Sequence, residues 1–311
     1  MMTSVAATLV APVIAQDTLK ITVIGTRSER AVEDIPASIK VIDLNDLRNQ
    51  GNTDLKSITR YEPGISVFDP RDSGNYRGTT STGNFNIRGM RKNRILSIQD
   101  NIRLPAGFYA VGYDYSNGNI VDYFTLKTID ILKGPASSLY GSDALGGVVS
   151  YNTLTVDDLL EEGEKIKYEF PTKFNSANDS VSGSGRVAYR DEESGFSLLA
   201  VISKSEAKEL KPNGSSDEYI NDAEISTNSG LLNLNKQIDP FNKIGFTIDT
   251  YFKDRDVARS SGNLSTGFIP YTKQESDVKQ NKIRYIMSWE HDAIDKTNFI
   301  DNLKAKIYYQ D

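Results

Sequence analysis

The sequence contains no cysteine, which excludes disulfide bridges and thiolate metal sites. It also lacks the usual catalytic signatures, because no GxxxxGK phosphate loop, GxSxG elbow or HExxH zinc motif occurs in it. Its single histidine, His291, stands alone in a strand-like stretch, so a rim or surface role explains it better than catalysis. We therefore expect neither an enzyme nor a resident cofactor or metal.

Excess positive charge and long apolar runs are missing as well. The net charge is −6, from 42 acidic and 36 basic residues, and no basic face is visible, which argues against a nucleic-acid partner. No stretch approaches the roughly 20 apolar residues of a membrane helix. A membrane protein of this composition would have to be a β-barrel, whose spans alternate in polarity and escape hydropathy analysis.

The most informative stretch is residues 128–152, TIDILKGPASSLYGSDALGGVVSYN. Residues 129–132 alternate as a strand does, and the Lys-Gly-Pro at 133–135 breaks that strand. Residues 136–140 have helical spacing for one or two turns. The glycines that follow allow a sharp turn before a last strand at 148–151. This order predicts a compact insert rather than a linker.

This segment resembles the end of the plug domain of TonB-dependent outer-membrane receptors. An upstream block resembles the central strands of the same domain; it comprises FNIRGM at 85–90, NRIL at 93–96 and DNIRLP at 100–105. The resemblance covers about the first half of the chain. It implies an α+β plug domain, at residues 28–155, followed by a transmembrane β-barrel.

Two N-terminal segments precede that domain. Residues 1–15 are apolar and small, with Val13 and Ala15 in the pattern that signal peptidase accepts, and predict a signal peptide; a buried N-terminal strand is the alternative. Residues 16–27 are short, β-branched and alternating. The resemblance identifies this stretch, with its linker, as the Ton box, which adds as a strand to the TonB protein. The TonB-interacting residues would be Leu19, Ile21, Thr22, Val23 and Ile24.

Three charged residues lie in strand-like, semi-buried sequence: Arg88, Asp130 and Lys133. A buried charge must be paired, because an uncompensated one costs several kcal/mol or shifts its pKa. The resemblance implies that they belong to an ion lock between plug and barrel wall. Asp130 stands where the family commonly has glutamate, which shortens its reach. Asn101 stands where glycine is common, and asparagine tolerates a left-handed backbone.

Two polar, glycine-containing stretches, 69–84 and 104–119, predict loops. They can be solvated loops, or apical plug loops that meet a ligand. Their ligand-binding candidates are Tyr76, Arg77, Phe108, Tyr109, Tyr113 and Tyr115. Packing is the alternative for each tyrosine, although aromatic rings stack on a porphyrin and phenolates ligate ferric iron.

From residue 156 onwards, alternation dominates. Ile244, Phe246 and Ile248 oppose Thr247 and Asp249, and Tyr285 and Met287 oppose Lys282 and Arg284. Such strands fit a barrel with an apolar face in lipid, although a soluble β-sandwich alternates in the same way. We count about seven strands, against about 22 in plugged transporters, so residues 156–311 are expected to form an incomplete, truncated antiparallel barrel.

The expected function is that of a TonB-dependent active transporter in the bacterial outer membrane, with the plug in the barrel lumen and the N-terminus periplasmic. Its partners would be TonB with the inner-membrane energising complex, and outer-membrane lipid. A "DLL" at 158–160 and the RGTTS run at 77–81 resemble haem and haemoglobin receptors, so haem, free or from haemoproteins, is the expected ligand. The alternatives are a ferric-siderophore receptor and a passive porin-like channel.

Overall fold

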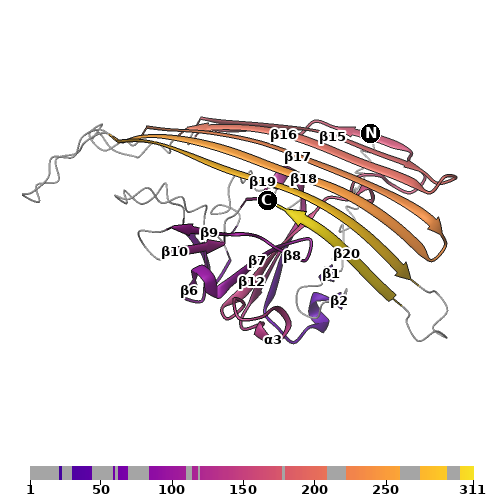
Figure 1. Cartoon of the computed structure of the whole chain (residues 1–311), viewed down its shortest axis with the longest axis horizontal. Coiled ribbons are helices and arrows are strands. Elements are labelled where there is room, and N and C mark those ends of the chain that lie inside the picture. The colour runs from indigo at the N-terminus through magenta and orange to yellow at the C-terminus, as the bar shows by residue number, and fades with distance from the viewer. Residues whose placement is uncertain are drawn as a thin grey trace, which may run out of the picture.

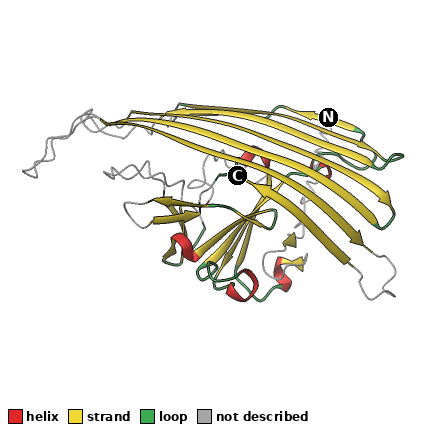
Figure 2. Cartoon of the chain, in the orientation of Figure 1, coloured by secondary structure: helices red, strands yellow, loops and turns green. Residues whose placement is uncertain are grey.

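The computed structural model describes residues 21–22, 30–43, 59, 62–68, 84–109, 114–117, 120–176, 179–208, 222–259, 274–292 and 302–311. These residues form two parts, a small mixed domain near the N-terminus and a broad, curved ladder of long strands above it (Figures 1 and 2). We call them the N-terminal domain and the strand ladder. Within the described ranges, no helix has the length and apolarity needed to span a membrane.

The N-terminal domain is built on a five-stranded sheet with the order β3-β11-β12-β7-β8. All neighbours are antiparallel except β12 and β7, which are parallel. The strands are β3 (Ile39–Asp43), β7 (Ile95–Gln99), β8 (Ile102–Arg103), β11 (Leu126–Lys133) and β12 (Gly147–Thr153). The central strands are buried on both faces, over Ile129–Leu132 of β11 and Gly147–Tyr151 of β12, and these buried stretches include the polar residues Asp130 and Ser150.

Short elements cover and connect this sheet. The short strands form separate small sheets. In these sheets, β1 (Ile21–Thr22) pairs with β2 (Arg30–Ala31), β5 (Asn84–Ile87) pairs with β4 (Ile65–Phe68) and β6 (Met90–Arg91), and β9 (Ala106–Tyr109) pairs with β10 (Asp114–Asn117). The helical turns are η1 (Val32–Asp34), η3 (Lys92–Arg94), η4 (Tyr123–Thr125), α3 (Ser137–Tyr140) and η5 (Val156–Asp158).

The domain has an apolar cluster on each face of the central sheet. On one face, Ile129 and Ile131 pack with residues of β4 and β5, including Phe85. On the other, Leu132 and Val148 pack with the segment around α3. The expected strand, break, short helix and strand at 128–152 are confirmed.

Gly147 shows why glycine is needed where β12 begins. Its φ is +158°, and a Cβ built there would lie 2.4 Å from the Leu132 carbonyl oxygen and 2.8 Å from Ile87 Cδ1. Any side chain would therefore force β12 away from β11.

The strand ladder follows chain order, β13-β15-β16-β17-β18-β19-β20, with β14 also paired to β15. Every pair is antiparallel. The strands are β13 (Ile166–Glu169), β14 (Thr172–Asn175), β15 (Ser180–Asp191), β16 (Phe196–Lys208), β17 (Asp222–Asp239), β18 (Asn242–Arg259), β19 (Gln274–Asp292) and β20 (Asn302–Gln310). The ladder is not closed, and it agrees with the expected series of barrel-type strands.

The ladder has a short-turn end and an extended end. Residues 192–195 join β15 to β16, and residues 240–241 join β17 to β18. The three longest strands, β17, β18 and β19, have 18, 18 and 19 residues. A membrane-crossing strand needs about 9–11 residues. These strands are therefore long enough to cross a bilayer and to continue beyond it.

The two faces of the ladder differ in polarity, as the alternation predicts. Apolar side chains on the outer face are exposed, with Ile202 at 71 % and Met287 at 63 %. Charged side chains on the inner face are buried, and Arg284 and Lys282 are 0 % and 1 % exposed. The N-terminal domain lies against this inner face (Figure 1).

The connector between the two parts is anchored by apolar contacts. Leu154, Val156, Leu159 and Leu160 form one cluster with inward-facing residues of the ladder, namely Ala188, Leu199, Val201 and Leu231. At its start, the backbone N–H of Leu154 donates to the Thr125 carbonyl oxygen. The connector is thus part of the contact between the domain and the ladder.

Candidate functional site

The predicted TonB-interacting segment is described in part. Ile21 and Thr22 form β1, which pairs antiparallel with β2 in the register Ile21 to Ala31 and Thr22 to Arg30. Leu19, Val23 and Ile24 lie outside the described residues. The two residues that can be placed are extended, as a segment that adds to a sheet must be.

The predicted ion-lock residues lie at three different places in the N-terminal domain. Asp130 is buried in the middle of β11, in register between Val41 and Ser150. The Lys133 ammonium lies 3.8 Å from Glu62 Oε2 and donates to the Pro63 carbonyl oxygen at 3.4 Å, and both partners belong to the same domain.

Arg88 is exposed in the turn between β5 and β6, with a φ of 50°. The neighbouring strand β6 lies on the side of the domain turned away from the ladder (Figure 1). The role of Arg88, Asp130 and Lys133 in an ion lock stays a prediction, because the domain–ladder contacts described below involve other residues.

The predicted ligand-binding residues are also described in part. The stretch 104–119, expected as a loop, contains a hairpin in which Phe108 pairs with Tyr115 and Tyr109 with Asp114. Tyr76, Arg77 and Tyr113 lie outside the described residues. The hairpin is on the left in Figure 1, on the side towards which β17, β18 and β19 extend.

The strongest contact between the domain and the ladder centres on Arg284 of β19. Its Nε donates to Asp249 Oδ2 at 2.8 Å, within the ladder. Its other two nitrogens reach the domain, where Nη1 donates to the Gln99 carbonyl oxygen at 3.1 Å and Nη2 to Asp100 Oδ2 at 3.0 Å. One planar guanidinium therefore joins both parts, which suits its fixed fork of donors.

A second buried cation completes this contact. Lys282 Nζ lies 2.9 Å from Asp249 Oδ2 and donates to Gln99 Oε1 at 2.7 Å. We call Asp100, Asp249, Lys282 and Arg284 the inner charge cluster. Two carboxylates face two cations, so the cluster carries no net charge, and each member has an opposite charge as a partner. Pairing of this kind is what makes buried charge tolerable.

Asp100 owes its position to a tight turn. Asp100 and Asn101 join β7 to β8 with φ values of 53° and 67°, the geometry of a two-residue hairpin turn that favours Asp and Asn. The tolerance expected of Asn101 is thereby confirmed. Asp100 Oδ1 accepts from the Thr153 backbone N–H at 2.9 Å and from its hydroxyl at 3.0 Å, while Oδ2 accepts from Arg284. One carboxylate thus links the end of β12 to the ladder.

Two further contacts involve the turn before β11. Asp122 Oδ1 caps η4 by accepting from the Phe124 N–H at 2.9 Å, and Oδ2 accepts from the hydroxyls of Ser203 and Ser229 on the ladder. Beside it, Arg186 Nη2 of β15 donates to the Phe124 carbonyl oxygen at 2.8 Å. At these contacts, the N-terminal domain presents carboxylates and carbonyl groups to the inner face of the ladder, and the ladder presents cations and hydroxyls.

The remaining contacts extend the same surface to both sides. On β20, Lys306 donates to the Asp100 carbonyl oxygen at 3.2 Å and Gln310 to that of Arg103 at 3.4 Å. Near the connector, Arg190 forms an ion pair with Asp157. In the core of the N-terminal domain, burial of Tyr151 raises the pKa of its phenol, so that group remains neutral.

Sequence reasoning did not single out the inner charge cluster. The alternation pattern placed Asp249, Lys282 and Arg284 on the polar face of their strands and gave them no further role. A usable signal was present, because Asp249 and Arg284 occupy inward positions on consecutive strands and carry opposite charges. Their direct pairing depends on the register of β18 against β19, which cannot be read from the sequence.

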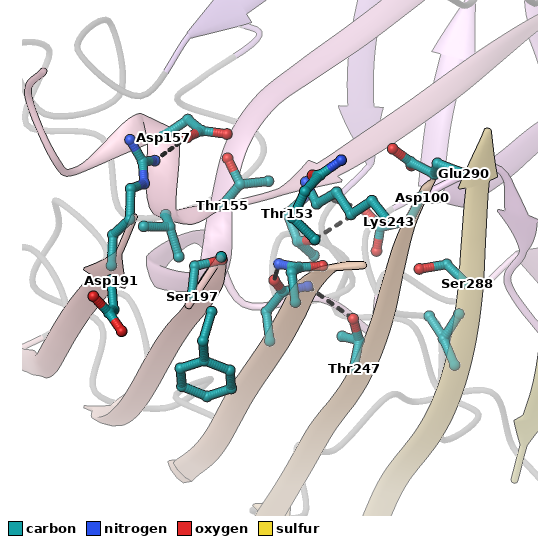
Figure 3. Close-up of a pocket in the computed structure, with 18 of the residues that line it drawn as sticks. Asp100, Thr153, Thr155, Asp157, Asp191, Ser197, Lys243, Thr247, Ser288 and Glu290 are labelled. Carbon is teal, nitrogen blue, oxygen red and sulfur yellow. Dashed lines mark hydrogen bonds and ion pairs between the residues drawn. The ribbon is translucent and has the colours of Figure 1, made fainter. Parts of the chain in front are cut away.

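A cavity of about 400 Å³ lies between the connector and the ladder near its short-turn end. Figure 3 shows Thr153, Thr155 and Asp157 on one side, facing Ser197, Thr247 and Ser288 of the ladder. In the described part of the chain, no group of three or more His, Asp or Glu side chains is arranged to hold a metal ion. His291 lies at the same end of the ladder, where Nδ1 is 3.0 Å from Asn242 Oδ1.

Comparison with known proteins gives a family match for the N-terminal domain. The model described as TonB-dependent Receptor Plug Domain matches residues 31–148. These residues run from the end of β2 to the start of β12, so the match covers β3, β7, β8 and β11 of the central sheet and the first residues of β12.

Sequence relatives are receptors. Lactoferrin-binding protein A from Neisseria meningitidis serogroup A is 26 % identical over 209 residues, which is 64 % of this chain and 21 % of that protein. A hemin receptor from Yersinia enterocolitica is 31 % identical over 152 residues, 49 % of this chain and 20 % of the relative. The chain spans about a fifth of the length of the curated relatives that it matches.

Solved structures share the fold. The FrpB iron transporter from Neisseria meningitidis superposes with a TM-score of 0.71 at 17 % identity, over 88 % of this chain and 40 % of that one. The ferripyoverdine receptor of the outer membrane of Pseudomonas aeruginosa gives 0.61 at 17 % identity, over 88 % and 34 %. Because both likenesses include the ladder, they support its assignment as part of a barrel.

Proposed function

This chain belongs to the TonB-dependent receptors through its plug domain, and we propose that it works in an outer-membrane active transporter for an iron-containing ligand. The observation that carries the proposal is a folded plug held against the inner face of a strand ladder by the inner charge cluster. A passive porin-like channel needs no such domain. Transport of this kind makes and breaks no covalent bond, so we propose no enzymatic role.

The ladder supports a location in the outer membrane. Its outer face carries exposed aliphatic and aromatic side chains, such as Ile307 at 79 % exposure, which would be costly in water and are favourable in lipid. Short turns of such barrels face the periplasm and long loops face outwards. The end with the turns 192–195 and 240–241 is thereby assigned to the periplasm.

TonB is the proposed energy-coupling partner. β1 is an extended segment before the plug, and main-chain pairing is its mode of interaction with β2. Addition of a TonB strand would use the same backbone groups of Ile21 and Thr22. A pull on this segment would be transmitted to the plug, whose attachments to the wall would then have to yield.

The ligand is proposed from relatives as well as from the sequence. Relatives are named for binding lactoferrin, transferrin and hemin, and a structural neighbour for ferripyoverdine. Haem, free or from haemoproteins, remains our proposal from the sequence resemblance; a ferric siderophore is the second candidate. The apical residues Phe108, Tyr109 and Tyr115 belong to a hairpin on the extended side of the ladder, which suits first contact with a ligand.

Growth of a receptor-deficient host tests this function. The full-length protein should restore growth of a haem-auxotrophic host on haem, or of an iron-starved host on a ferric siderophore. Ile21→Pro, which removes a backbone donor, should abolish that growth, whereas Ile21→Ala keeps the donor and should preserve it. Growth that survives Ile21→Pro would remove the Ton-box assignment, and growth on no iron source would contradict iron import.

A further inference from the structure

The register of β18 against β19 is not set by a tight turn. Residues 240–241 join β17 to β18, and so short a connection fixes the register of that hairpin. The strands β18 and β19 are joined by the much longer segment 260–273. Because closing a long connection costs nearly the same in neighbouring registers, the register of this pair must be determined by side chains.

The charges of the inner face leave two registers open. In the structure, Arg284 lies opposite Asp249. A slide of β19 by two residues would keep every side chain on its own face and would place Lys282, a second cation, opposite the same carboxylate. The opposite slide would place Ile286 there, and the carboxylate would lose its directly opposed cation. The inner face therefore accepts both the observed register and the first of these slides.

The apolar residues of the outer face do not separate these two registers either. Ile248 lies opposite Tyr285 and would lie opposite Ile283 after the slide. Phe246 would lie opposite Tyr285 in place of Met287. Large apolar or aromatic side chains face one another in both arrangements, so cross-strand packing favours neither.

One polar residue of the outer face does separate them. Asn242 Oδ1 accepts from Trp289 Nε1 at 3.2 Å and lies 3.0 Å from His291 Nδ1, and the sequence has no other tryptophan or histidine. The amide nitrogen of Asn242 donates to both carboxylate oxygens of Asp239, at 3.0 and 2.8 Å. The amide oxygen is therefore the end that faces β19, and His291 Nδ1 carries the proton that it donates.

This arrangement requires the observed register. Asn242 lies directly opposite His291, and Trp289 is the next outward residue of β19. After the two-residue slide, Trp289 would lie opposite Asn242, and His291 would lie opposite the β17–β18 turn, out of reach of the amide. The acceptor cannot follow, because the turn is fixed by Asp239 Oδ1, which accepts from the backbone N–H groups of Phe241 and Asn242 at 2.8 and 2.9 Å.

We propose that Asn242 selects the register of β18 against β19 and thereby places Arg284, rather than Lys282, opposite Asp249. Asn242 is a positioning residue, since it acts on the inner charge cluster through strand alignment. The inference gives the single histidine and the single tryptophan of the sequence a role as its two donors. It concerns assembly of the ladder and is independent of the ligand.

Disulfide trapping in the full-length protein measures this register, because residues 1–311 contain no cysteine. The Asp292 N–H donates to the Phe241 carbonyl oxygen at 2.9 Å, so the outward pairs of β18 and β19 are non-hydrogen-bonded pairs, whose side chains lie closest. Ile248→Cys with Tyr285→Cys reports the observed register, and Ile248→Cys with Ile283→Cys reports the slide. Outer-membrane preparations are oxidised, and mass spectrometry quantifies each disulfide.

The measured quantity is the ratio of the observed-register disulfide to the slid-register disulfide. Asn242→Ala should lower this ratio about tenfold, because it removes the acceptor of two hydrogen bonds that require the observed register. Asn228→Ala, at an outward asparagine of β17 opposite Phe252, is the matched control and should leave the ratio unchanged. An unchanged ratio in Asn242→Ala would overturn the proposal.

Removal of the competing cation gives a readout that a merely stabilising asparagine would not move. Asn242→Ala combined with Lys282→Gln should restore the ratio, because the slide then offers Asp249 no cation. If Asn242→Ala alone yields no assembled protein, the same double variant decides the question. Recovery of assembled protein would support register selection by Asn242, and continued failure would overturn it.

Discussion

The plug and the ladder bury opposite kinds of residue. In the plug, Ile129 and Ile131 are fully buried in the sheet core. In the ladder, Ile202 and Ile307 point outwards and are exposed, while Arg284 is fully buried on the inner face. The plug follows the rule for a protein in water, and the ladder follows its inverse.

This difference in which residues are buried shows that the plug and the ladder are stabilised in different environments. A plug with apolar clusters on both sides of its sheet has an internal reason to fold. The buried polar groups on the inner face of the ladder need partners, and the plug turns supply them: Asp100 pairs with Arg284, and Asp122 accepts from the hydroxyls of Ser203 and Ser229. The outer face exposes aliphatic side chains such as Ile202 and Ile307, whose transfer from water to an apolar environment is favourable.

The largest expected effect comes from the inner charge cluster. Arg284→Ala leaves Asp249 and Asp100 with Lys282 as their remaining cation, and should cost about 3–5 kcal/mol of stability. Denaturant unfolding of the full-length protein in detergent measures it. The free energy of unfolding of Arg284→Lys, which keeps the charge but loses the fork of donors, should lie between those of Arg284→Ala and the parent protein. A loss below about 1 kcal/mol would mean that plug and wall are not joined there.

The outer face should give the next largest effect. Met287→Lys places a charge towards lipid and should cost about 2–4 kcal/mol if the position is near the bilayer midplane. Folding into lipid vesicles is the measurement. The matched control is Ser288→Lys, one residue away and facing inwards, which should cost less than half as much. Equal costs for both variants would contradict the inverted polarity of the ladder.

A smaller effect is expected at Gly147, where β12 approaches β11 closely inside the plug. Gly147→Ala puts a methyl group 2.4 Å from the Leu132 carbonyl oxygen and should cost about 1–3 kcal/mol. Gly183→Ala in the ladder would meet Thr172 Cγ2 at an ordinary 3.7 Å, so thermal unfolding of that variant should match the parent. If the two alanines cost the same, the tight packing of the β11–β12 pair would be in doubt.

The smallest effect should come from an exposed ion pair of the ladder. Lys304 Nζ lies 3.9 Å from Glu290 Oε1, and the two side chains are 49 % and 36 % exposed. Lys304→Ala should cost about 0.2–1 kcal/mol, and the difference should vanish at high salt. A cost as large as that of Arg284→Ala would show that burial does not separate the two kinds of pair.

Much of the fold could be predicted from local patterns. The break at Lys133-Gly134-Pro135, the short helix and the following strand depend on backbone preferences of neighbouring residues, and the structure contains all three. The inward and outward sides of the ladder follow from a period of two. The hairpin β9–β10 was not predicted, because a polar, glycine-containing stretch carries no alternation that would indicate strands.

The candidate site was harder to predict. Lys133 was rightly seen as a charge needing a partner, yet its partner in the structure, Glu62, belongs to a turn far earlier in the chain. Asp100 was noticed for its turn, which is a local property, and not for its carboxylate. Its partner Arg284 is 184 residues away in the sequence.

The sequence by itself determined the plug fold and the alternation of the ladder, because both follow from residues close together in the chain. The tertiary structure decided which charges pair, where the plug touches the ladder and that a cavity lies between the connector and the ladder. These outcomes depend on strand register and on the docking of one part against the other. A shift of one residue in register would exchange the two faces, so contacts across the two parts cannot be inferred from either part alone.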